Sequence, residues 1–532
     1  MIDDNQMYEK ELFKTDVIEK IKNIVGENRI LRDFEDLYVY SFEKILDEKY
    51  KTEFLAVVKS SDKLELELIE EILEKENIFK LYRENKKLQT VNNQCDYTRT
   101  IFIDNVSPIK LSEKLSEYEN NIKKNKKEID LFKNDVANNL LGASKRTSSA
   151  LRLFLDKKLF RHCQDCEICT GYCTVAPFFN HIETWSSKGR YLLTKGLMNE
   201  EISLSKKLID VIYSCTLCGS CFMQCTKGLE IDRAIINARR YIAEKELAPK
   251  TVQVISENVK KTDNPFGLPK DLRTFFLDDL NRNQMKHISK NNESDLLFWV
   301  GCNTAFRAPE IACSVIDILS KLDISVNLLG EEEGCCGSIL VFGGFFDSAR
   351  KNAEMIIKKI SNTGASTIIT SCAGCYEAFN LIYPEFLDVK LPFRVLHTSQ
   401  FLDQLNKEGI LTLQEIDMKV TYQDPCSLGR HCHVYDAPRN ILKSIPGLEL
   451  REMPQNKEYS RCCGGGGGLY AFNNDASIDS SHRLTQDVVS MGLNKIVTTC
   501  PQCYTTLRIL AKKWEDLRIF DLSEIVSKSL KT

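Results

Sequence analysis

The C-terminal part of the chain alternates short apolar runs with longer segments of helical spacing. Runs rich in β-branched and apolar residues lie at 296–300, 367–370 and 495–498, and helical stretches separate them. Short apolar runs that alternate with helical segments predict parallel α/β sheets. Because the pattern occurs twice, we predict two similar α/β domains, at residues 291–415 and 416–532.

The N-terminal part has a weaker pattern, which predicts a small α/β domain over residues 1–110. Residues 63–75 place leucine and isoleucine at helical spacing, between apolar runs at 54–58 and 100–103. This part contains no cysteine motif, so we expect a docking or structural domain. The strongly charged residues 111–155 are predicted to form a helical linker.

Residues 156–290 are predicted to be mainly helical. Residues 229–246 have the spacing of an amphipathic helix, and further helices are expected over 249–285, with a break at Asn264 and Pro265. The predicted fold class of the whole chain is therefore a multidomain protein with α+β and α/β parts and a helical domain between them.

Composition and charge give no indication of a nucleic-acid partner, an export signal or a membrane span. The chain has 532 residues, and its formal net charge of -3 gives no reason to expect a nucleic-acid partner. Its acidic, polar start does not resemble a signal peptide, and no apolar run approaches the roughly 18 residues of a membrane span. We therefore expect a cytoplasmic protein that would reach a membrane only through a partner subunit.

Cysteine gives the strongest chemical signal. Of the 21 cysteines, 18 fall into four motifs. In a chain without an export signal, such clusters are more often metal ligands or catalytic groups than disulfides. The three remaining cysteines, Cys95, Cys313 and Cys432, are expected to be small buried hydrophobic residues.

Two motifs of four cysteines have the spacing C-x2-C-x2-C-x3-C, which is similar to the bacterial two-cluster ferredoxin pattern. In that pattern the fourth cysteine of each motif ligates the other cluster. The spacing favours two cubane [4Fe–4S] clusters over the alternative, a four-thiolate zinc site. The expected ligand sets are Cys163, Cys166, Cys169 and Cys225 for one cluster, and Cys215, Cys218, Cys221 and Cys173 for the other.

Both motifs depart from the ferredoxin pattern after the fourth cysteine. Thr174 and Thr226 stand where proline is usual. Proline has no amide hydrogen, so each threonine leaves a donor near its cluster. We expect this donor to tune the potential without preventing cluster assembly.

Two motifs of five cysteines lie in the two predicted α/β domains. Each has a lone cysteine, a vicinal pair in a glycine-rich turn, and a C-x-x-C that follows a predicted strand, at nearly equal spacing. The candidate ligands are Cys302, Cys335, Cys336, Cys372 and Cys375 in one motif, and Cys426, Cys462, Cys463, Cys500 and Cys503 in the other. They lie at the C-terminal ends of predicted strands, where open α/β sheets bind ligands, and each lone cysteine is predicted to be the last residue of its strand. A vicinal disulfide, a cysteine-rich zinc site and one half kept only as a scaffold are the alternatives.

The second of these motifs has a specific family resemblance. Residues 424–430, Asp-Pro-Cys-Ser-Leu-Gly-Arg, and 462–468, two cysteines and five glycines, resemble the CCG motifs of the heterodisulfide reductase family. In that family, one iron–sulfur subunit contains a ferredoxin module and two CCG halves in a single polypeptide. Residues 150–532 resemble this subunit, because they have the same parts in the same order. The resemblance implies two noncubane [4Fe–4S] clusters, each held by one five-cysteine motif, that together reduce a disulfide.

Polar residues around the lone cysteine of the second motif are the remaining candidates there. Ser427 stands where the resemblance leads us to expect histidine. Arg430, His431 and His433 could bind an anionic substrate or orient a proton donor, but the simpler interpretation is that they are ordinary loop residues.

Residues 1–110 have a weak resemblance to the first lobe of the FAD-binding domain in the glycolate and D-lactate dehydrogenase family. The phrase Ile-Val-Gly-Glu-Asn at 24–28 and the pair Tyr40-Ser41 carry it. A flavin site there needs a glycine-rich loop, because glycine lets the backbone approach a pyrophosphate. Residues 83–87 read Arg-Glu-Asn-Lys-Lys at that place, so we expect no flavin in this chain.

Two functions are consistent with these patterns. The first is a catalytic subunit that takes electrons from a partner and reduces a small disulfide, as the complete motifs in both halves indicate. The second is an electron-transfer subunit of an FAD-linked lactate or glycolate dehydrogenase complex, as the N-terminal resemblance indicates. The expected partners are a flavoprotein, a hydrogenase or a membrane cytochrome b.

Overall fold

The computed structural model describes in full residues 163, 166–289, 293–512 and 516–531, and it describes the backbone of four strands nearer the N-terminus. The chain divides into two compact units, residues 1–152 and 153–532. No helix within these described ranges is long and apolar enough to cross a membrane.

The first unit contains a four-stranded antiparallel sheet in the order β1-β2-β4-β3. Its strands are β1 (Ile30–Leu31), β2 (Phe54–Ser60), β3 (Lys80–Glu84) and β4 (Arg99–Asp104). β2 and β4 cover the apolar runs at 54–58 and 100–103, which confirms both as strands. The helix predicted at 63–75, the linker at 111–155 and Cys95 lie outside the described residues.

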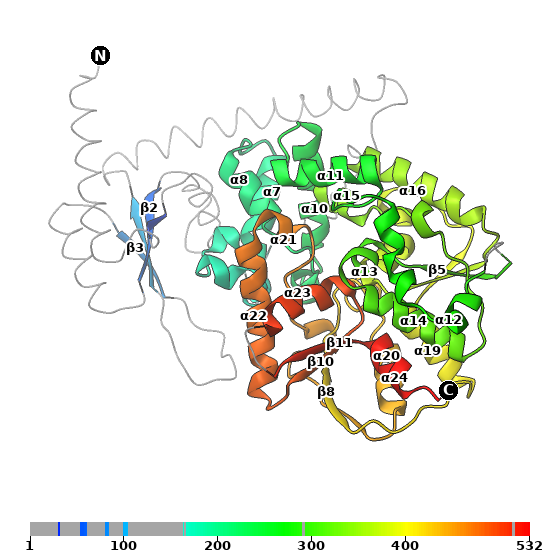
Figure 1. Ribbon diagram of the computed structural model, residues 1–532. Coiled ribbons are helices and arrows are strands. Elements are labelled where there is room, and N and C mark those ends of the chain that lie inside the picture. The colour runs from blue at the N-terminus through cyan, green and yellow to red at the C-terminus, as the bar shows by residue number, and fades with distance from the viewer. Residues whose placement is uncertain are drawn as a thin grey trace, which may run out of the picture. The chain divides into compact units, whose positions relative to one another are not determined.

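The second unit begins with a helical module, as predicted. Its main helices are α7 (Ser187–Met198), α8 (Lys206–Tyr213), α10 (Ile231–Glu244) and α11 (Lys250–Thr262). Ser186 and Ser205 begin α7 and α8 by accepting hydrogen bonds from backbone amides one turn later. α10 lies within the amphipathic segment predicted at 229–246, and Figure 1 shows it among the other helices of the module.

The predicted break after α11 is confirmed and has a local cause. The buried side chain of Asn264 donates to the carbonyls of Thr262 and Leu268 and accepts from the amides of Phe266 and Leu268. This side chain satisfies the backbone groups that the end of the helix leaves open. The chain continues through the 3-10 segment η5 (Asp271–Asp279) and the short helix α12 (Arg282–Lys286).

Two parallel sheets follow, one in each half of the remaining chain. The first half contains β5 (Leu296–Trp299), β6 (Thr367–Thr370) and β7 (Arg394–His397), in the order β5-β6-β7. The second contains β8 (Met418–Tyr422), β9 (Leu448–Leu450), β10 (Lys495–Thr498) and β11 (Arg518–Asp521), in the order β11-β10-β8-β9. A parallel bridge between Leu297 and Asn327 occupies the place that β9 has in the second sheet. The two halves therefore share one topology, as the repeated pattern predicted.

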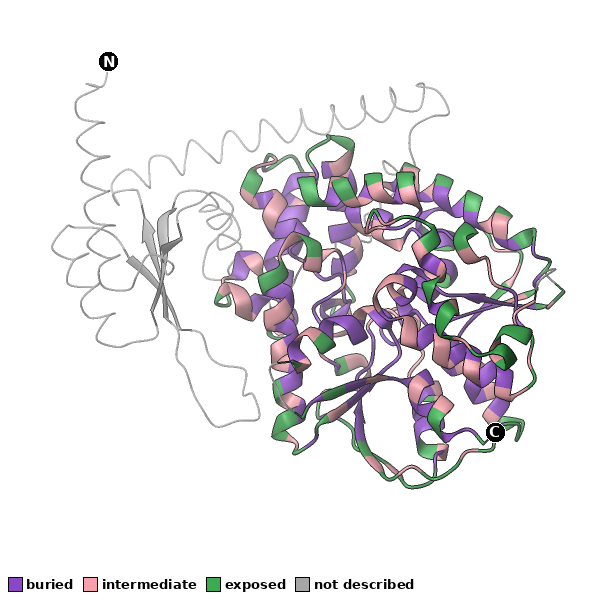
Figure 2. Cartoon of the chain, in the orientation of Figure 1, coloured by how far each residue is buried: buried purple, intermediate pink, exposed green. Residues whose placement is uncertain are grey.

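One hydrophobic core joins the halves. Ile318 of α14 (Pro309–Lys321) and Leu402 of α19 (Thr398–Lys407) pack in the same cluster as Val420 of β8 and Val497 of β10. Figure 2 shows the strands of the two parallel sheets largely buried, except β9, and the outer faces of the helices exposed. Because apolar surface is buried across the boundary, the two sheets are held in a fixed relation.

Arg239 of α10 links the helical module to both halves. Its side chain is completely buried, and burial lowers the pKa of its guanidinium to about 10, which leaves it charged at neutral pH. The guanidinium donates to five backbone carbonyls at 2.6 to 3.2 Å: Ile212, Tyr213 and Cys215 of the module, Phe342 of the first half and Gly467 of the second. A single side chain thus satisfies carbonyls from three parts of the fold.

Arg239→Met is expected to lower the free energy of unfolding by about 3 kcal/mol or more, because buried carbonyls in three segments lose their donor. Denaturant unfolding of the anaerobically purified chain measures this change. Arg233→Met on the same helix is the control, because Arg233 forms a surface ion pair with Glu385 that is worth at most about 1 kcal/mol. Equal losses in the two variants would contradict the role given to Arg239.

Candidate functional site

The five-cysteine motifs lie at the C-terminal edges of the two parallel sheets. Cys372 is the N-cap of α17 (Ala373–Glu377), and Cys500 is the N-cap of α23 (Pro501–Ala511). Cys302 and Cys426 were each predicted to end a strand, and this detail is wrong: Cys302 is the first residue of α13 (Cys302–Arg307), and Cys426 lies four residues after the end of β8. Gly301, with a φ of 80°, turns the chain between β5 and that helix.

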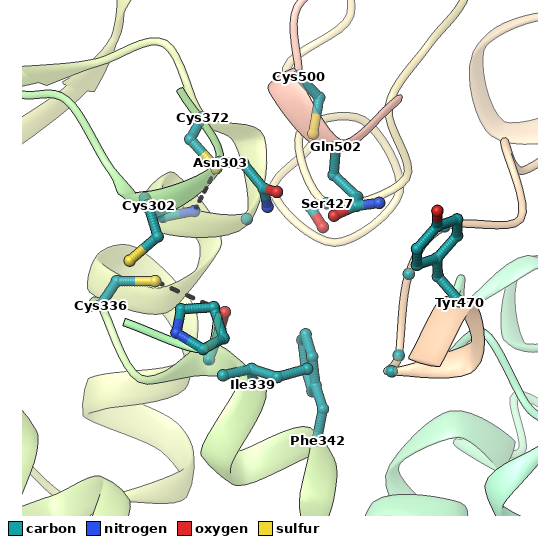
Figure 3. Close-up of a pocket in the computed structure, with 18 of the residues that line it drawn as sticks. Cys302, Asn303, Cys336, Ile339, Phe342, Cys372, Ser427, Tyr470, Cys500 and Gln502 are labelled. Atoms are coloured by element: carbon teal, nitrogen blue, oxygen red, sulfur yellow. Dashed lines mark hydrogen bonds between the residues drawn. The ribbon is translucent and has the colours of Figure 1, made fainter. Parts of the chain in front are cut away.

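The two motifs open onto one cavity of about 540 Å³ between the halves. Figure 3 shows Cys302, Cys336 and Cys372 on one side of this space and Cys500 on the other. The lining cysteines are Cys302, Cys335, Cys336, Cys372, Cys375, Cys426, Cys463, Cys500 and Cys503. The tenth, Cys462, is buried and its thiol lies beside that of Cys218 of the helical module. The structure therefore brings both motifs together at one site.

The C-x-x-C segments of the two halves meet directly. Hydrogen bonding with the Cys372 thiol lowers the pKa of Cys500. The buried His397 lies beside them, with Nε2 at 3.3 Å from the carbonyl oxygen of Ser371 and 3.0 Å from that of Thr499. Burial lowers the pKa of His397 to about 4, so the ring is neutral at pH 7 and its Nε2–H donates to these carbonyls. His397 thus holds together the residues that precede Cys372 and Cys500.

Backbone amides surround the vicinal pairs. The amide of Gly337 donates to Cys335 Sγ at 3.4 Å, and the amide of Gly464 donates to Cys462 Sγ at 3.4 Å. Both glycines have a φ near 80°, which L side chains rarely adopt. Hydrogen bonds to cysteine sulfur stabilise its charged form and shift the potential of a cluster bound there. The glycine-rich turns therefore supply amide donors to the sulfur of the vicinal pairs.

A buried arginine accompanies the lone cysteine of each half. Arg273 Nη2 lies 3.7 Å from Cys302 Sγ, and its Nη1 pairs with the buried Glu333 at 3.1 Å. In the second half, burial by itself lowers the pKa of Arg430, but the nearby thiolates, among them Cys426, raise it above its usual value. Each lone cysteine therefore has positive charge beside it.

The four-cysteine motifs form two groups in the helical module. Cys163, Cys166, Cys169 and Cys225 line one small pocket, which joins three residues of the first motif to the last residue of the second. In the other group, burial raises the pKa of Cys215 to about 11, although the nearby Arg190 lowers it. Arg190 Nη1 also lies 3.6 Å from Cys173 Sγ, so one guanidinium reaches both motifs. Charge interactions further couple Cys221 with Cys215 and Cys218.

These groups are suited to clusters. Among the described residues, no three His, Cys, Asp or Glu side chains form a site for a single metal ion. Cluster ligands instead bind different irons, so they surround a volume. The donors are thiols throughout, and a Cβ on Gly301 would come within 3.1 Å of Cys375 Sγ. Nη2 of Arg430 is buried beside three cysteines without a partner among the described atoms. The residues present therefore fit iron–sulfur clusters.

Arg430 and His431 connect the second half to the helical module. Arg430 Nε donates to the carbonyl of Cys218 at 2.6 Å, and Nη1 donates to that of Ser460 at 2.6 Å. His431 Nε2 lies 3.0 Å from the carbonyl oxygen of Leu217. Neither residue lines the cavity, so their contacts support a structural role. Ser427 does line it and hydrogen bonds with the buried Glu377.

Several residues at the site had no motif to reveal them. Arg273, His397 and Glu333 come from segments outside the cysteine patterns, and only the fold brings them to the thiols. Of these three, Glu333 could have been found from the sequence. It lies two positions before the vicinal pair, and a carboxylate buried there needs a partner. Thr226, the residue that stands where proline is usual after Cys225, has its hydroxyl 3.9 Å from Cys166 Sγ.

Comparisons with known proteins agree with this arrangement. A 4Fe-4S dicluster domain family matches residues 160–229, and a cysteine-rich domain family matches 296–380 and 420–508. Over 390 residues the chain is 28% identical to a dihydromethanophenazine:CoB–CoM heterodisulfide reductase subunit of Methanosarcina barkeri, and the match covers 69% of this chain and 93% of that protein. The chain is a heterodisulfide reductase-like iron–sulfur oxidoreductase.

Other relatives of this heterodisulfide reductase-like chain have different names. It is 26% identical to a fumarate reductase (CoM/CoB) subunit of Methanothermobacter marburgensis, over 70% of this chain and 73% of that protein. It is 28% identical to an EtfAB:quinone oxidoreductase of Syntrophomonas wolfei, over 60% of this chain but only 47% of that protein. The relatives from Methanosarcina barkeri and Methanothermobacter marburgensis are each named as a subunit of a larger oxidoreductase.

Gly301→Ala is expected to reduce the iron bound per chain, because its Cβ would press on Cys375 Sγ at the first five-cysteine motif. Gly409→Ala is the matched control: Gly409 has a φ of 73° and open space where a Cβ would be built. Both variants bear backbone strain of order 1–3 kcal/mol, and only the first meets a cysteine. Iron analysis after anaerobic purification measures the difference, and equal iron contents would contradict the prediction.

Proposed function

We propose that the chain holds four iron–sulfur clusters and reduces a disulfide in the cavity between the two halves. The proposed cubane ligands are Cys163, Cys166, Cys169 and Cys225, and Cys215, Cys218, Cys221 and Cys173. The proposed noncubane ligands are Cys302, Cys335, Cys336, Cys372 and Cys375, and Cys426, Cys462, Cys463, Cys500 and Cys503.

The shared cavity is the observation that supports this function. Nine of the ten cysteines in the five-cysteine motifs line it, and the thiol of Cys372 in one half lies beside that of Cys500 in the other. Reduction of RS–SR′ consumes two electrons and two protons and releases RSH and R′SH. When bound, the clusters supply the electrons one at a time. A cavity with a thiolate motif on each side can accept both sulfurs of one disulfide.

The chain's own residues prepare this cavity. Phe266, Ile339 and Phe342 give it an apolar wall that excludes water and strengthens nearby electrostatic interactions. The amides of Gly337 and Gly465 donate to the sulfur of cysteines that line the cavity. These donors, with the charge of the buried arginines, stabilise negative sulfur on both sides of the cavity.

The contact between Cys218 and Cys462 suggests where electrons enter. Hydrogen bonding with Cys462 lowers the pKa of Cys218, and Arg430 binds the Cys218 carbonyl from the second half. The helical module and the second five-cysteine motif thus meet at their thiols. We infer that electrons from a partner pass through the helical module to the second half first.

Electron paramagnetic resonance of the anaerobically purified chain, oxidised with a small thiol present, tests the function. We expect a signal that appears only with thiol and broadens when the thiol carries sulfur-33. We also expect about sixteen irons per chain, four for each cluster.

Two cysteine variants test whether the thiol-dependent signal comes from the cavity. Cys372→Ser is expected to abolish the thiol response, because Cys372 lines the cavity, whereas Cys313→Ser is expected to retain it, because Cys313 does not. About eight irons per chain, two cubane clusters' worth, with no thiol response would show that the cavity does not carry the chemistry.

An electron-transfer role without disulfide chemistry is the second candidate. The similarity to an EtfAB:quinone oxidoreductase favours it, as does the resemblance of residues 1–110 to a flavoprotein lobe. In this role the chain passes electrons from a flavoprotein, such as a lactate or glycolate dehydrogenase, to another carrier. Reduction of the chain by such a flavoprotein, combined with no thiol response, would favour this candidate.

A further inference from the structure

The indole nitrogen of Trp299 is a buried donor that no atom within the described ranges satisfies. Trp299 is the last residue of β5, and its side chain is completely buried. Its Nε1–H has no hydrogen-bond partner among the described atoms. Buried donors in native proteins are nearly always paired, because an unpaired donor loses its hydration without compensation. This N–H therefore needs a partner other than the described side chains and backbone.

The indole N–H lies beside the first five-cysteine motif. A Cβ built on Gly301 would come within 3.8 Å of Trp299 Nε1 and within 3.1 Å of Cys375 Sγ. The indole nitrogen and this candidate ligand thus approach the same point, and a residue without a side chain leaves that point open. Gly301 also directly precedes Cys302, the lone cysteine of the motif. The donor is therefore next to the thiols that would hold the first noncubane cluster.

Aromatic packing fixes the orientation of the indole. The ring of Phe379 meets that of Trp299 edge to face, with the centroids 5.3 Å apart and the planes at 90°. Phe379 in turn contacts Tyr383, with the centroids 5.3 Å apart, and the Tyr383 hydroxyl donates to the carbonyl of Cys336 at 2.8 Å. Phe379 belongs to the π-helical segment η7 (Ala378–Ile382), and such segments are frequent at functional sites. The element that follows the C-x-x-C of the motif thus holds the indole in place.

At the equivalent place in the second half, the side-chain donor is already used. Gln423 stands three residues before the lone cysteine there, as Trp299 does in the first half. Gln423 Nε2 donates to the carbonyl of Asp424 at 2.7 Å, and its Oε1 accepts from the hydroxyl of Thr498 at 2.8 Å. The two halves share one topology, but at this position only the first has a buried N–H that is available to a bound group.

A hydrogen bond to sulfur has a defined effect on an iron–sulfur cluster. The potential of a cluster depends on the hydrogen bonds to its sulfurs, because a donor stabilises the more negative, reduced state. The tryptophan N–H is a donor only, and electron-rich sulfur is an acceptor that matches it. In a buried, low-dielectric setting such a bond is stronger than in water. Loss of the donor would therefore lower the potential of the cluster beside it.

We propose that Trp299 Nε1–H donates a hydrogen bond to sulfur of the cluster held by the first five-cysteine motif, and that it raises the potential of this cluster alone. The proposal rests on the proposed function in one respect, since it takes this motif to hold a cluster. Trp299 then gives the two similar halves different electronic environments, because the equivalent side chain of the second half donates to the backbone.

Nitrogen-15 in the indole ring tests the contact directly. The full chain is produced with tryptophan labelled at the indole nitrogen and is titrated anaerobically with reductant and, with a thiol present, with oxidant. Pulsed electron paramagnetic resonance examines each cluster as it becomes paramagnetic, and we expect nitrogen-15 coupling to one cluster. The chain has three tryptophans. Trp299→Phe should abolish the coupling, whereas Trp185→Phe should keep it, because Trp185 stacks on Phe179 in the helical module.

Redox titration of the same samples measures the effect on the potential. Trp299→Phe should lower the equilibrium constant for reduction of one cluster roughly tenfold, or about 59 mV for a one-electron couple, and leave the other clusters unchanged. Phe379→Leu is the packing control, because it removes the ring that contacts the indole but keeps the N–H. This control variant should retain both the nitrogen coupling and the potential.

No nitrogen coupling at any cluster of the iron-loaded, unmodified chain would overturn the proposal, since another group, such as a buried water, would then satisfy the indole. This measurement needs no substitution, so it decides even where a variant loses iron. An equal fall in potential in Trp299→Phe and Phe379→Leu would also overturn the proposal, because packing would then carry the effect. Both results leave the proposed function standing. About eight irons per chain, two cubane clusters' worth, would instead overturn the function and this proposal together.

Discussion

The arrangement of the second unit depends on Arg239. This buried guanidinium binds carbonyls of the helical module, the first half and the second half at once, and one of these is Cys215, a candidate cluster ligand. The close approach leaves no room for side chains: a Cβ on Gly344 would lie 2.3 Å from the Arg239 carbonyl oxygen, and a Cβ on Gly467 would lie 2.6 Å from the Thr216 backbone. Glycine at these positions is therefore a requirement of the three-way junction.

The junction explains why the cysteines form a connected series. It places the Cys218 loop against the second half, where Arg430 binds the Cys218 carbonyl and Cys462 lies beside the Cys218 thiol. The core shared by the halves in turn brings Cys372 to Cys500. Buried arginines accompany these thiols, among them Arg190, Arg273 and Arg430, because negative sulfur buried away from water needs compensating charge. Packing thus brings the cysteines together, and the buried arginines compensate the negative charge of the same cysteines.

Much of this was predictable from the sequence. The cysteine spacing predicted two groups that mix the four-cysteine motifs, and Cys225 does lie with Cys163 and Cys169. The repeated pattern of apolar runs predicted parallel strands, and β6 and β10 lie where it placed them. These features are local, so periodicity and spacing reveal them.

Features that depend on tertiary packing were not predictable. Nothing in the sequence around Arg307 or His397 indicates that one lines a cavity and the other joins two C-x-x-C segments. Arg430 and His431 lie close to Cys426 in the sequence, yet their side chains bind the helical module. Proximity along the chain was a poor guide there because the second half contacts the module through the loop that follows Cys426.

The most direct test of the shared cavity is iron anomalous diffraction from anaerobically grown crystals of the full chain. We predict iron at four places, two in the helical module and two on facing sides of the cavity, beside Cys302 and beside Cys426. Iron confined to the helical module, with Cys335 and Cys336 joined in a disulfide, would contradict it.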